Sequence, residues 1–205
     1  MLSGAVPLSD LPRDEQGLCL IAAPRRLEQS ETIVHELPAL LDSAMAHFDA
    51  IVANTGANWG EQHAVLLERS SRALFLVDQR ASSLRACKHA VELCARCGIA
   101  ASPFLFVANR CSKRSLFSSI DVSCAMQGAH AAELKDGGVE VEQALGTGLA
   151  YDLVSSRNAF AQSVRELMGE VVGEAAGSLA SSEESEAPSR GLFSFRRARR
   201  EGVLP

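Results

Sequence analysis

The sequence of 205 residues contains few aromatic residues, which make up 5% of it. A core with so few large rings has to be built from Ala, Val, Leu and Ile, and this favours helices packed on a sheet over an all-β sandwich. The sequence also lacks an excess of positive charge, because its formal net charge is −5 at pH 7. This charge gives no electrostatic reason to expect nucleic-acid binding.

Long apolar runs are absent as well. No uninterrupted stretch approaches the roughly 18 apolar residues that suggest a membrane-spanning helix. The opening residues, MLSGAVPLSDLPRDEQ, have neither the basic start nor the apolar core of a secretory signal peptide. We therefore expect a cytoplasmic protein, with peripheral contact at the inner face of the cell membrane as an open alternative.

The six cysteines and five histidines lack the spacing of a metal site. Cys94 and Cys97 form a C-x-x-C pair, but no second pair lies at zinc-finger spacing. Leu84, Cys87 and Cys94 recur at helical steps, which predicts that the thiols face the core from a helix over 82–98. A redox or metal role for the C-x-x-C pair is the alternative. No metal-ligating residue is expected.

Short apolar runs alternate with amphipathic stretches along most of the chain. The expected strands are 18–22, 48–54, 73–77, 104–109 and 130–134. The expected helices are 32–47, 61–70, 82–98, 119–126, 141–145 and 156–172. This alternation predicts βαβ units, and therefore an α/β fold with a mostly parallel sheet covered by helices on both faces.

The composition divides the chain into three parts. We expect residues 1–16 to be an irregular lead-in and residues 17–173 to form the α/β domain. Residues 174–205 are rich in Ala, Ser and Glu at first, which predicts a disordered tail. A short basic-apolar segment at 191–200 predicts docking on a membrane surface or a partner, and a solvated segment without a role is the alternative. Its large apolar and basic residues are Leu192, Phe193, Phe195, Arg196, Arg197, Arg199 and Arg200.

The stretch FDAIVANTGANWGE at 48–61 is the most informative for function. Its apolar run, 50–53, predicts a parallel strand buried on both faces, which Asn54 and Thr55 then end. Ligands bind at the carboxyl ends of strands in open α/β sheets, so a site is expected at this junction. A catalytic site would carry a metal-directing carboxylate there, whereas this chain has Asn54.

Together these segments resemble the ParA/MinD superfamily of deviant P-loop ATPases, and within it the CpaE/TadZ-like branch associated with Flp (Tad) pilus assembly. The order of the motifs, over about 15–172, carries the resemblance. GLCLIAAP at 17–24 looks like the branch's strand ending in AAP, and FDAIVANTG at 48–56 resembles its Walker B strand. FVANR at 106–110 is similar to the strand end whose asparagine contacts adenine, and 141–149 with 157–167 resembles the closing stretch.

The chain departs from that family where phosphate and metal are bound. A Walker A loop needs glycines that admit phosphate and a lysine that neutralises it. None of Lys88, Lys113 and Lys135 stands in a G-K-[ST] motif, so the Walker A region is missing. The neutral amide of Asn54 cannot replace the carboxylate that holds Mg²⁺. We therefore expect no catalytic residue and no independent ATP hydrolysis.

The resemblance implies four nucleotide-binding candidates: Asn54, Thr55, Asn109 and Arg110. The alternative for Asn109 is to cap the following turn through its side chain. We expect no cofactor, and ATP and Mg²⁺ would become cofactors only if missing upstream sequence supplied a P-loop.

Our leading hypothesis is a non-catalytic localisation or scaffold protein of the ParA/MinD type. The resemblance implies pilus or secretion machinery as its partner, and a homodimer. One alternative is the C-terminal portion of an active ATPase whose P-loop is encoded upstream, and another is a generic α/β interaction domain. In relatives the P-loop strand lies inside the sheet, so its absence predicts a rearranged sheet, a covering partner or a truncated reading frame.

Overall fold

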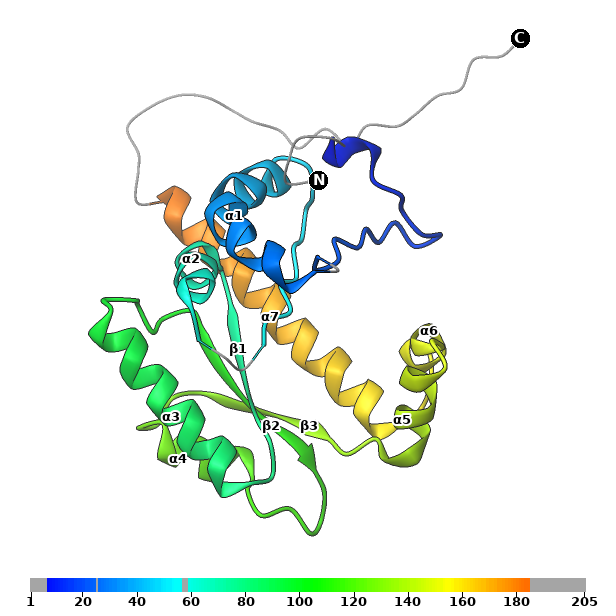
Figure 1. Cartoon of the computed structure of the whole chain (residues 1–205). Helices are drawn as coiled ribbons and strands as arrows, with labels where there is room; N and C mark the ends of the chain where they lie inside the picture. The colour runs from blue at the N-terminus through cyan, green and yellow to red at the C-terminus, as the bar shows by residue number, and fades with distance from the viewer. Residues whose placement is uncertain (1–6, 25, 57–58, 185–205) are drawn as a thin grey trace.

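The computed structural model describes residues 7–24, 26–56 and 59–184 (Figure 1). Its centre is a three-stranded parallel sheet in the order β1-β2-β3. The strands are β1 (Ala73–Val77), β2 (Phe104–Cys111) and β3 (Ala131–Lys135). The α-helices are α1 (Ser30–Met45), α2 (Glu61–Arg69), α3 (Ala81–Arg96), α4 (Ser119–Ala125), α5 (Gly138–Gly146), α6 (Ala150–Val154) and α7 (Ala159–Glu184). The chain therefore has the α/β fold, with a parallel sheet, that the sequence predicts.

β2 is the central strand, and its side chains fill a separate core on each face of the sheet. Phe106 and Ala108 pack on one face, with Cys94 of α3 and Val122 of α4. Leu105 and Val107 pack on the opposite face, where Leu167 of α7 and Leu134 of β3 complete a second core. Burial on alternate faces explains why residues 104–108 of this strand are all apolar, as in a parallel strand covered by helices on both sides.

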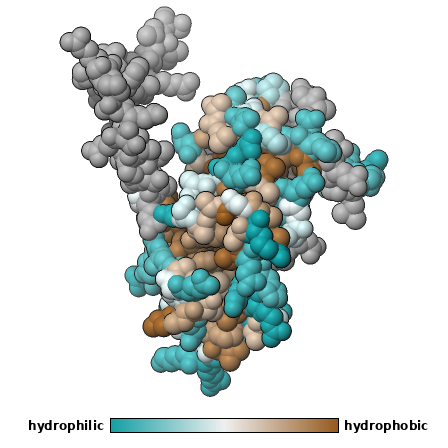
Figure 2. All heavy atoms as spheres, turned by 90° about the vertical axis from the view of Figure 1, so that its left-hand side faces the viewer, coloured by the Kyte–Doolittle hydropathy of each residue, from teal (hydrophilic) through white to brown (hydrophobic). Residues whose placement is uncertain are grey.

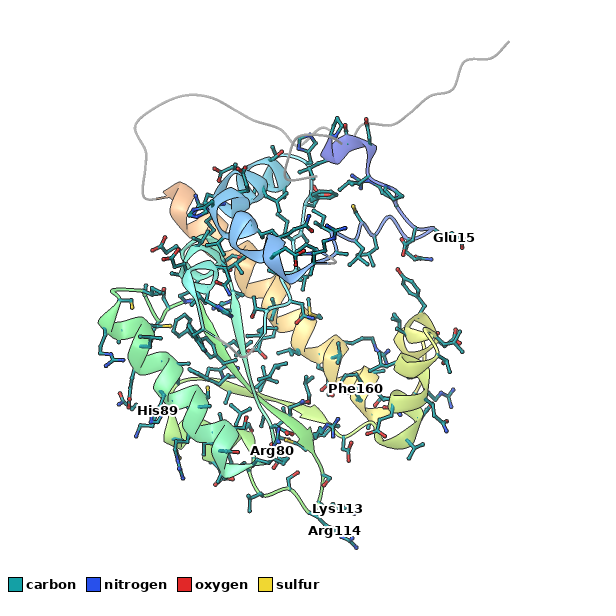
Figure 3. All side chains as sticks on the ribbon, in the orientation of Figure 1. Glu15, Arg80, His89, Lys113, Arg114 and Phe160 are labelled. Carbon is teal, nitrogen blue, oxygen red and sulfur yellow. The ribbon has the colours of Figure 1, made fainter. Side chains whose placement is uncertain are left out.

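The cysteines of α3 lie where the helical pattern predicts. Cys87 and Cys94 are buried, and Cys97 at the end of the helix is exposed. Burial raises the pKa of the Cys87 thiol to about 11, and it raises the pKa of Cys94 as well. Thiols of this kind are packing groups rather than nucleophiles. Hydrophilic and hydrophobic residues are interspersed on the face on which α3 lies (Figure 2), and His89 projects from the outer side of this helix (Figure 3).

Two of the expected strands are wrong. Residues 18–22 form no strand, and their segment makes only an isolated bridge between Arg13 and Cys19. Residues 48–54 form no strand either, and Val52 is 89% exposed. A parallel strand is buried only where neighbouring strands share its hydrogen bonds. None of the three strands of the described sheet pairs with residues 18–22 or 48–54.

The ends of the α/β part also differ from expectation. The lead-in contains a short 3₁₀ turn, Leu8–Asp10, whose Leu8 packs with Leu11 and Ala44 in a small core beside α1. Another 3₁₀ turn, Leu27–Gln29, precedes α1, and α6 was not expected. The last helix extends to Glu184 instead of ending at residue 172. The basic-apolar segment at 191–200 lies outside the described residues.

No helix in the described part of the chain is long and apolar enough to span a membrane.

Candidate functional site

The carboxyl ends of the strands meet at one edge of the parallel sheet, the edge at which open α/β proteins bind ligands (Figure 1). The residues that follow β1 are Asp78, Gln79 and Arg80. The carboxyl end of β2 contains Asn109 and Arg110. The sequence analysis selected the two β2 residues. Gln79 was not among the predicted residues, although it bonds to both β2 and the loop before α4.

Gln79 links the end of β1 to β2 and to the loop before α4. Its Nε2 donates to the carbonyl oxygen of Asn109 at 2.9 Å, and its Oε1 accepts from the backbone N–H of Phe117 at 2.8 Å. Both polar ends of this half-buried side chain are therefore used within the protein. A single sequence carries no clear signal for such a role, because the two partners lie 30 and 38 residues away along the chain.

Asn109 and Arg110 form a tight turn at the end of β2. The Oδ1 of Asn109 accepts from the backbone N–H of Arg110 at 3.0 Å, a turn-capping bond. Arg110 has a φ of 55°, a left-handed conformation that non-glycine residues rarely adopt. The β2–β3 register shifts between Ala108 and Cys111, so the turn coincides with an irregularity in the ladder. The Arg110 side chain is exposed.

Glu133 of β3 holds the start of α4 against the sheet. Its Oε1 accepts from the backbone N–H and the hydroxyl of Ser119, each at 3.1 Å, and its Oε2 accepts from Lys135 Nζ at 2.6 Å. The Lys135 hydrogen bond, together with those of Ser119, lowers the pKa of Glu133. The same bond raises the pKa of Lys135. This carboxylate is occupied by structural partners.

Asn54 and Thr55 lie on the exposed, unpaired segment that precedes α2. No hydrogen bond or ion pair within the described residues joins them to Asn109 or Arg110. The structure therefore joins the two pairs of nucleotide-binding candidates by no hydrogen bond and no ion pair among the described residues.

His63 and Trp59 hold the end of that segment on the sheet. His63 Nδ1 accepts from the Gly60 N–H and its Nε2 donates to the Gly56 carbonyl, both at 3.2 Å. Trp59 stacks on His63 and on Phe75 of β1, with ring centroids 5.1 Å and 6.2 Å apart. The buried His63 is thus a structural residue rather than a metal ligand, and Trp59 is the one tryptophan of the sequence.

Three positive side chains follow the ends of β1 and β2: Arg80, Lys113 and Arg114. Arg80 forms an ion pair with Asp78 at 3.0 Å. Lys113 and Arg114 project from the loop after β2, away from the body of the protein (Figure 3). The described residues contain no group of three or more His, Cys, Asp or Glu side chains that could hold a metal ion.

Comparison with known proteins identifies the fold. No protein-family model and no curated protein matches the chain. A ParA family ATPase from Chlorobium tepidum TLS superimposes with a TM-score of 0.65 at 18% identity, over 78% of this chain and 64% of that one. A chain of the MinC:MinD cell division protein complex of Aquifex aeolicus gives a TM-score of 0.56 at 18% identity, over 82% of this chain and 71% of that one.

The chain has the ParA/MinD fold. The match spans less than two thirds of the Chlorobium ATPase.

ATP and Mg²⁺, which a ParA family ATPase fold implies, do not fit the described residues. The position expected to hold a metal-directing carboxylate is the exposed amide of Asn54, and the carboxylates of Asp78 and Glu133 are already engaged with cations.

Proposed function

We propose that the chain is a non-catalytic ParA/MinD-like localisation or scaffold protein that serves a pilus-assembly or secretion machine. The observation that carries the proposal is the combination of a ParA/MinD fold with a carboxyl edge whose polar groups bind one another. The side chains of Gln79, Asn109 and Glu133 all form hydrogen bonds with the protein's own backbone or side chains.

The MinC:MinD neighbour supports a role in protein binding, since that fold occurs there in a complex with a partner protein. In this proposal, pilus or secretion proteins are the partners and the chain works as a homodimer. Its place is the cytoplasm or the inner face of the cell membrane.

Nucleotide binding is the direct test of the non-catalytic assignment. We expect no ATP hydrolysis above background and no change in melting temperature with Mg·ATP, since a ligand stabilises only a native state that binds it. A ParA family ATPase assayed in parallel is the positive control. A melting-temperature increase of several degrees would contradict the proposal, and its loss in Asn109→Ala and Arg110→Ala variants would place the nucleotide at the end of β2.

The basic-apolar segment at 191–200 is the proposed membrane or partner contact. Apolar and basic side chains in one short segment can bind an anionic lipid surface weakly and reversibly. Co-sedimentation with anionic vesicles should fall when Phe193 and Phe195 are both changed to Ser. Equal sedimentation of the variant and the unchanged chain would remove the membrane role and leave the scaffold role standing.

A further inference from the structure

β3 is an edge strand, and its free side faces α7. The carbonyl of His130 accepts from an N–H of β2 at 3.4 Å, so every second residue from there points its backbone groups towards β2. The N–H of Lys135 points the other way and donates to Ser163 Oγ of α7 at 3.0 Å. The backbone groups of Ala131 and Glu133 point to that side as well, and no other part of the described chain forms a hydrogen bond with them.

A groove of about 530 Å³ lies between this strand edge and one stripe of α7. Ala132 of β3 and Ala159 and Leu167 of α7 form its apolar part. α7 runs back over the sheet from near the carboxyl end of β3 (Figure 1). Five strand residues and the helical stripe from Ala159 to Glu170 both extend for roughly 16 Å. A strand edge that faces a helix can bind an extended peptide by strand addition.

Two carboxylates give the groove a negative charge. Glu166 is exposed and forms no hydrogen bond or ion pair among the described residues, although its charge helps Glu133 to raise the pKa of Lys135. Glu170 Oε1 bonds to His130 Nε2 at 2.5 Å, and this histidine is charged only when protonated. Lys135 also lines the groove, but Glu133 balances its charge at 2.6 Å. The remaining charge favours a ligand with positive side chains.

The chain itself contains a segment that fits this groove. Residues 191–200 combine large apolar side chains with four arginines. Arg197 and Arg199 are two residues apart, so in a strand they would lie on one face, about 7 Å from each other. Glu166 and Glu170 are one helical turn apart, about 6 Å along α7. The two spacings are close enough for each arginine to meet one carboxylate.

The connection to the groove is long enough. α7 ends at Glu184, roughly 21 Å along the helix from Glu170. The chain from Glu184 to Arg197 can extend over roughly 43 Å, so it can return along α7 and reach Glu170 before Glu166. Such a tether gives the segment an effective concentration of the order of millimolar at the groove, which favours this occupant over a separate peptide.

We propose that residues 193–200 bind in the groove of the same chain as an added strand, parallel to β3. Arg197 then pairs with Glu170. Arg199 pairs with Glu166. The outward backbone groups of β3 gain partners by the same contact. A docked segment cannot also contact a membrane or a partner protein, so the groove regulates the contact assigned to this segment, and this last consequence rests on the proposed function.

Amide hydrogen exchange of the full chain, followed by NMR, tests the docking. The Ala131 and Glu133 amides should exchange about tenfold faster when Arg197 and Arg199 are both changed to Glu, as expected if the segment is docked about 90% of the time. Arg196→Glu combined with Arg200→Glu is the matched control. It changes the charge equally on the opposite side of the added strand, and it should leave both amides protected.

Exchanging the charges tests the pairing. Glu166→Arg combined with Glu170→Arg should remove the protection, and adding Arg197→Glu and Arg199→Glu to this variant should restore it. His130→Gln alters the same Glu170 hydrogen bond but keeps both carboxylates, so it should preserve the protection. Far-UV circular dichroism checks that each variant folds.

Three results would overturn the inference. The first is fast exchange of the Ala131 and Glu133 amides in the unchanged chain. The second is protection that survives the changes at Arg197 and Arg199, which would mean that another segment covers this edge. The third is protection that rises with chain concentration from about 10 μM to about 500 μM, which would place the segment in the groove of a second copy. The samples contain neither vesicles nor nucleotide, so these results are distinguishable from a failure of the proposed function.

Discussion

Two stretches of this chain, 50–53 and 104–108, are both entirely apolar but have different structures. The second forms the buried part of β2, with Val107 fully inaccessible. The first is extended and exposed, although it is apolar throughout. The difference lies in their neighbours, because β2 has a strand on each side and helices on both faces. An apolar run shows that a segment is suited to burial. Whether the segment is buried depends on strands and helices from other parts of the chain that pack against it.

The largest expected effect is on stability, when a leucine is replaced by alanine in the core strand rather than in an exposed segment. Leu105→Ala in β2 removes a side chain that is 3% exposed, and it should lower the free energy of unfolding by about 2–5 kcal/mol. Leu20→Ala, at a position 78% exposed, should change it by less than about 0.5 kcal/mol. Urea unfolding followed by circular dichroism measures both. Equal losses would mean that residues 18–22 are buried like β2.

A smaller effect should come from the link between β1 and β2. Gln79→Ala leaves the carbonyl of Asn109 and the N–H of Phe117 without this partner, at a cost of about 1–3 kcal/mol. Gln143→Ala on the exposed side of α5 is the matched control, and its effect should stay within about 0.5 kcal/mol. If the two variants unfold at the same urea concentration, Gln79 does not hold this edge together.

The smallest expected effect depends on pH. The pKa of Glu133 is lowered in the folded protein, so its contribution to stability is present above its ordinary pKa of 4.5 and is lost as the pH falls through the folded value. The pKa of Lys135 is raised, so its contribution is lost only as the pH rises above 10.5 through its folded value. The contribution should stay below about 1 kcal/mol, since both side chains are partly exposed.

Melting temperatures measured at several pH values test this pair. Glu133→Gln should flatten the loss of stability on acidification, and Glu142→Gln, an exposed glutamate of α5, should not. An unchanged acid profile in Glu133→Gln would contradict the assigned role of this carboxylate.

The sequence predicted well those elements whose partners follow closely along the chain. β1 has the predicted bounds, and α3 and α4 differ by one or two residues, because apolar spacing and capping residues are local signals. The two missing strands failed for a different reason. Residues 18–22 and 48–54 have the composition of strands, but the local pattern cannot report whether a neighbouring strand is present.

The candidate site shows the same limit. Asn109 and Arg110 could be selected from a motif at a strand end, and they do lie at the carboxyl edge of the sheet. The roles of Gln79, His63 and the Glu133–Ser119 contact could not be predicted from the sequence. Each role depends on contacts between distant segments or on the shape of a turn, and neither follows from the local sequence pattern. Neither could the sequence tell that β1 pairs with β2 alone among the described residues.

Hydrogen exchange at residues 49–54 and 104–111, with and without Mg·ATP, tests most directly that the ParA/MinD fold persists here without a nucleotide site. The account predicts slow exchange for the buried β2 amides, fast exchange for residues 49–54, and no change in either when Mg·ATP is added. Slow exchange of residues 49–54 on addition of Mg·ATP would contradict it, since nucleotide would then be ordering the segment that carries Asn54 and Thr55.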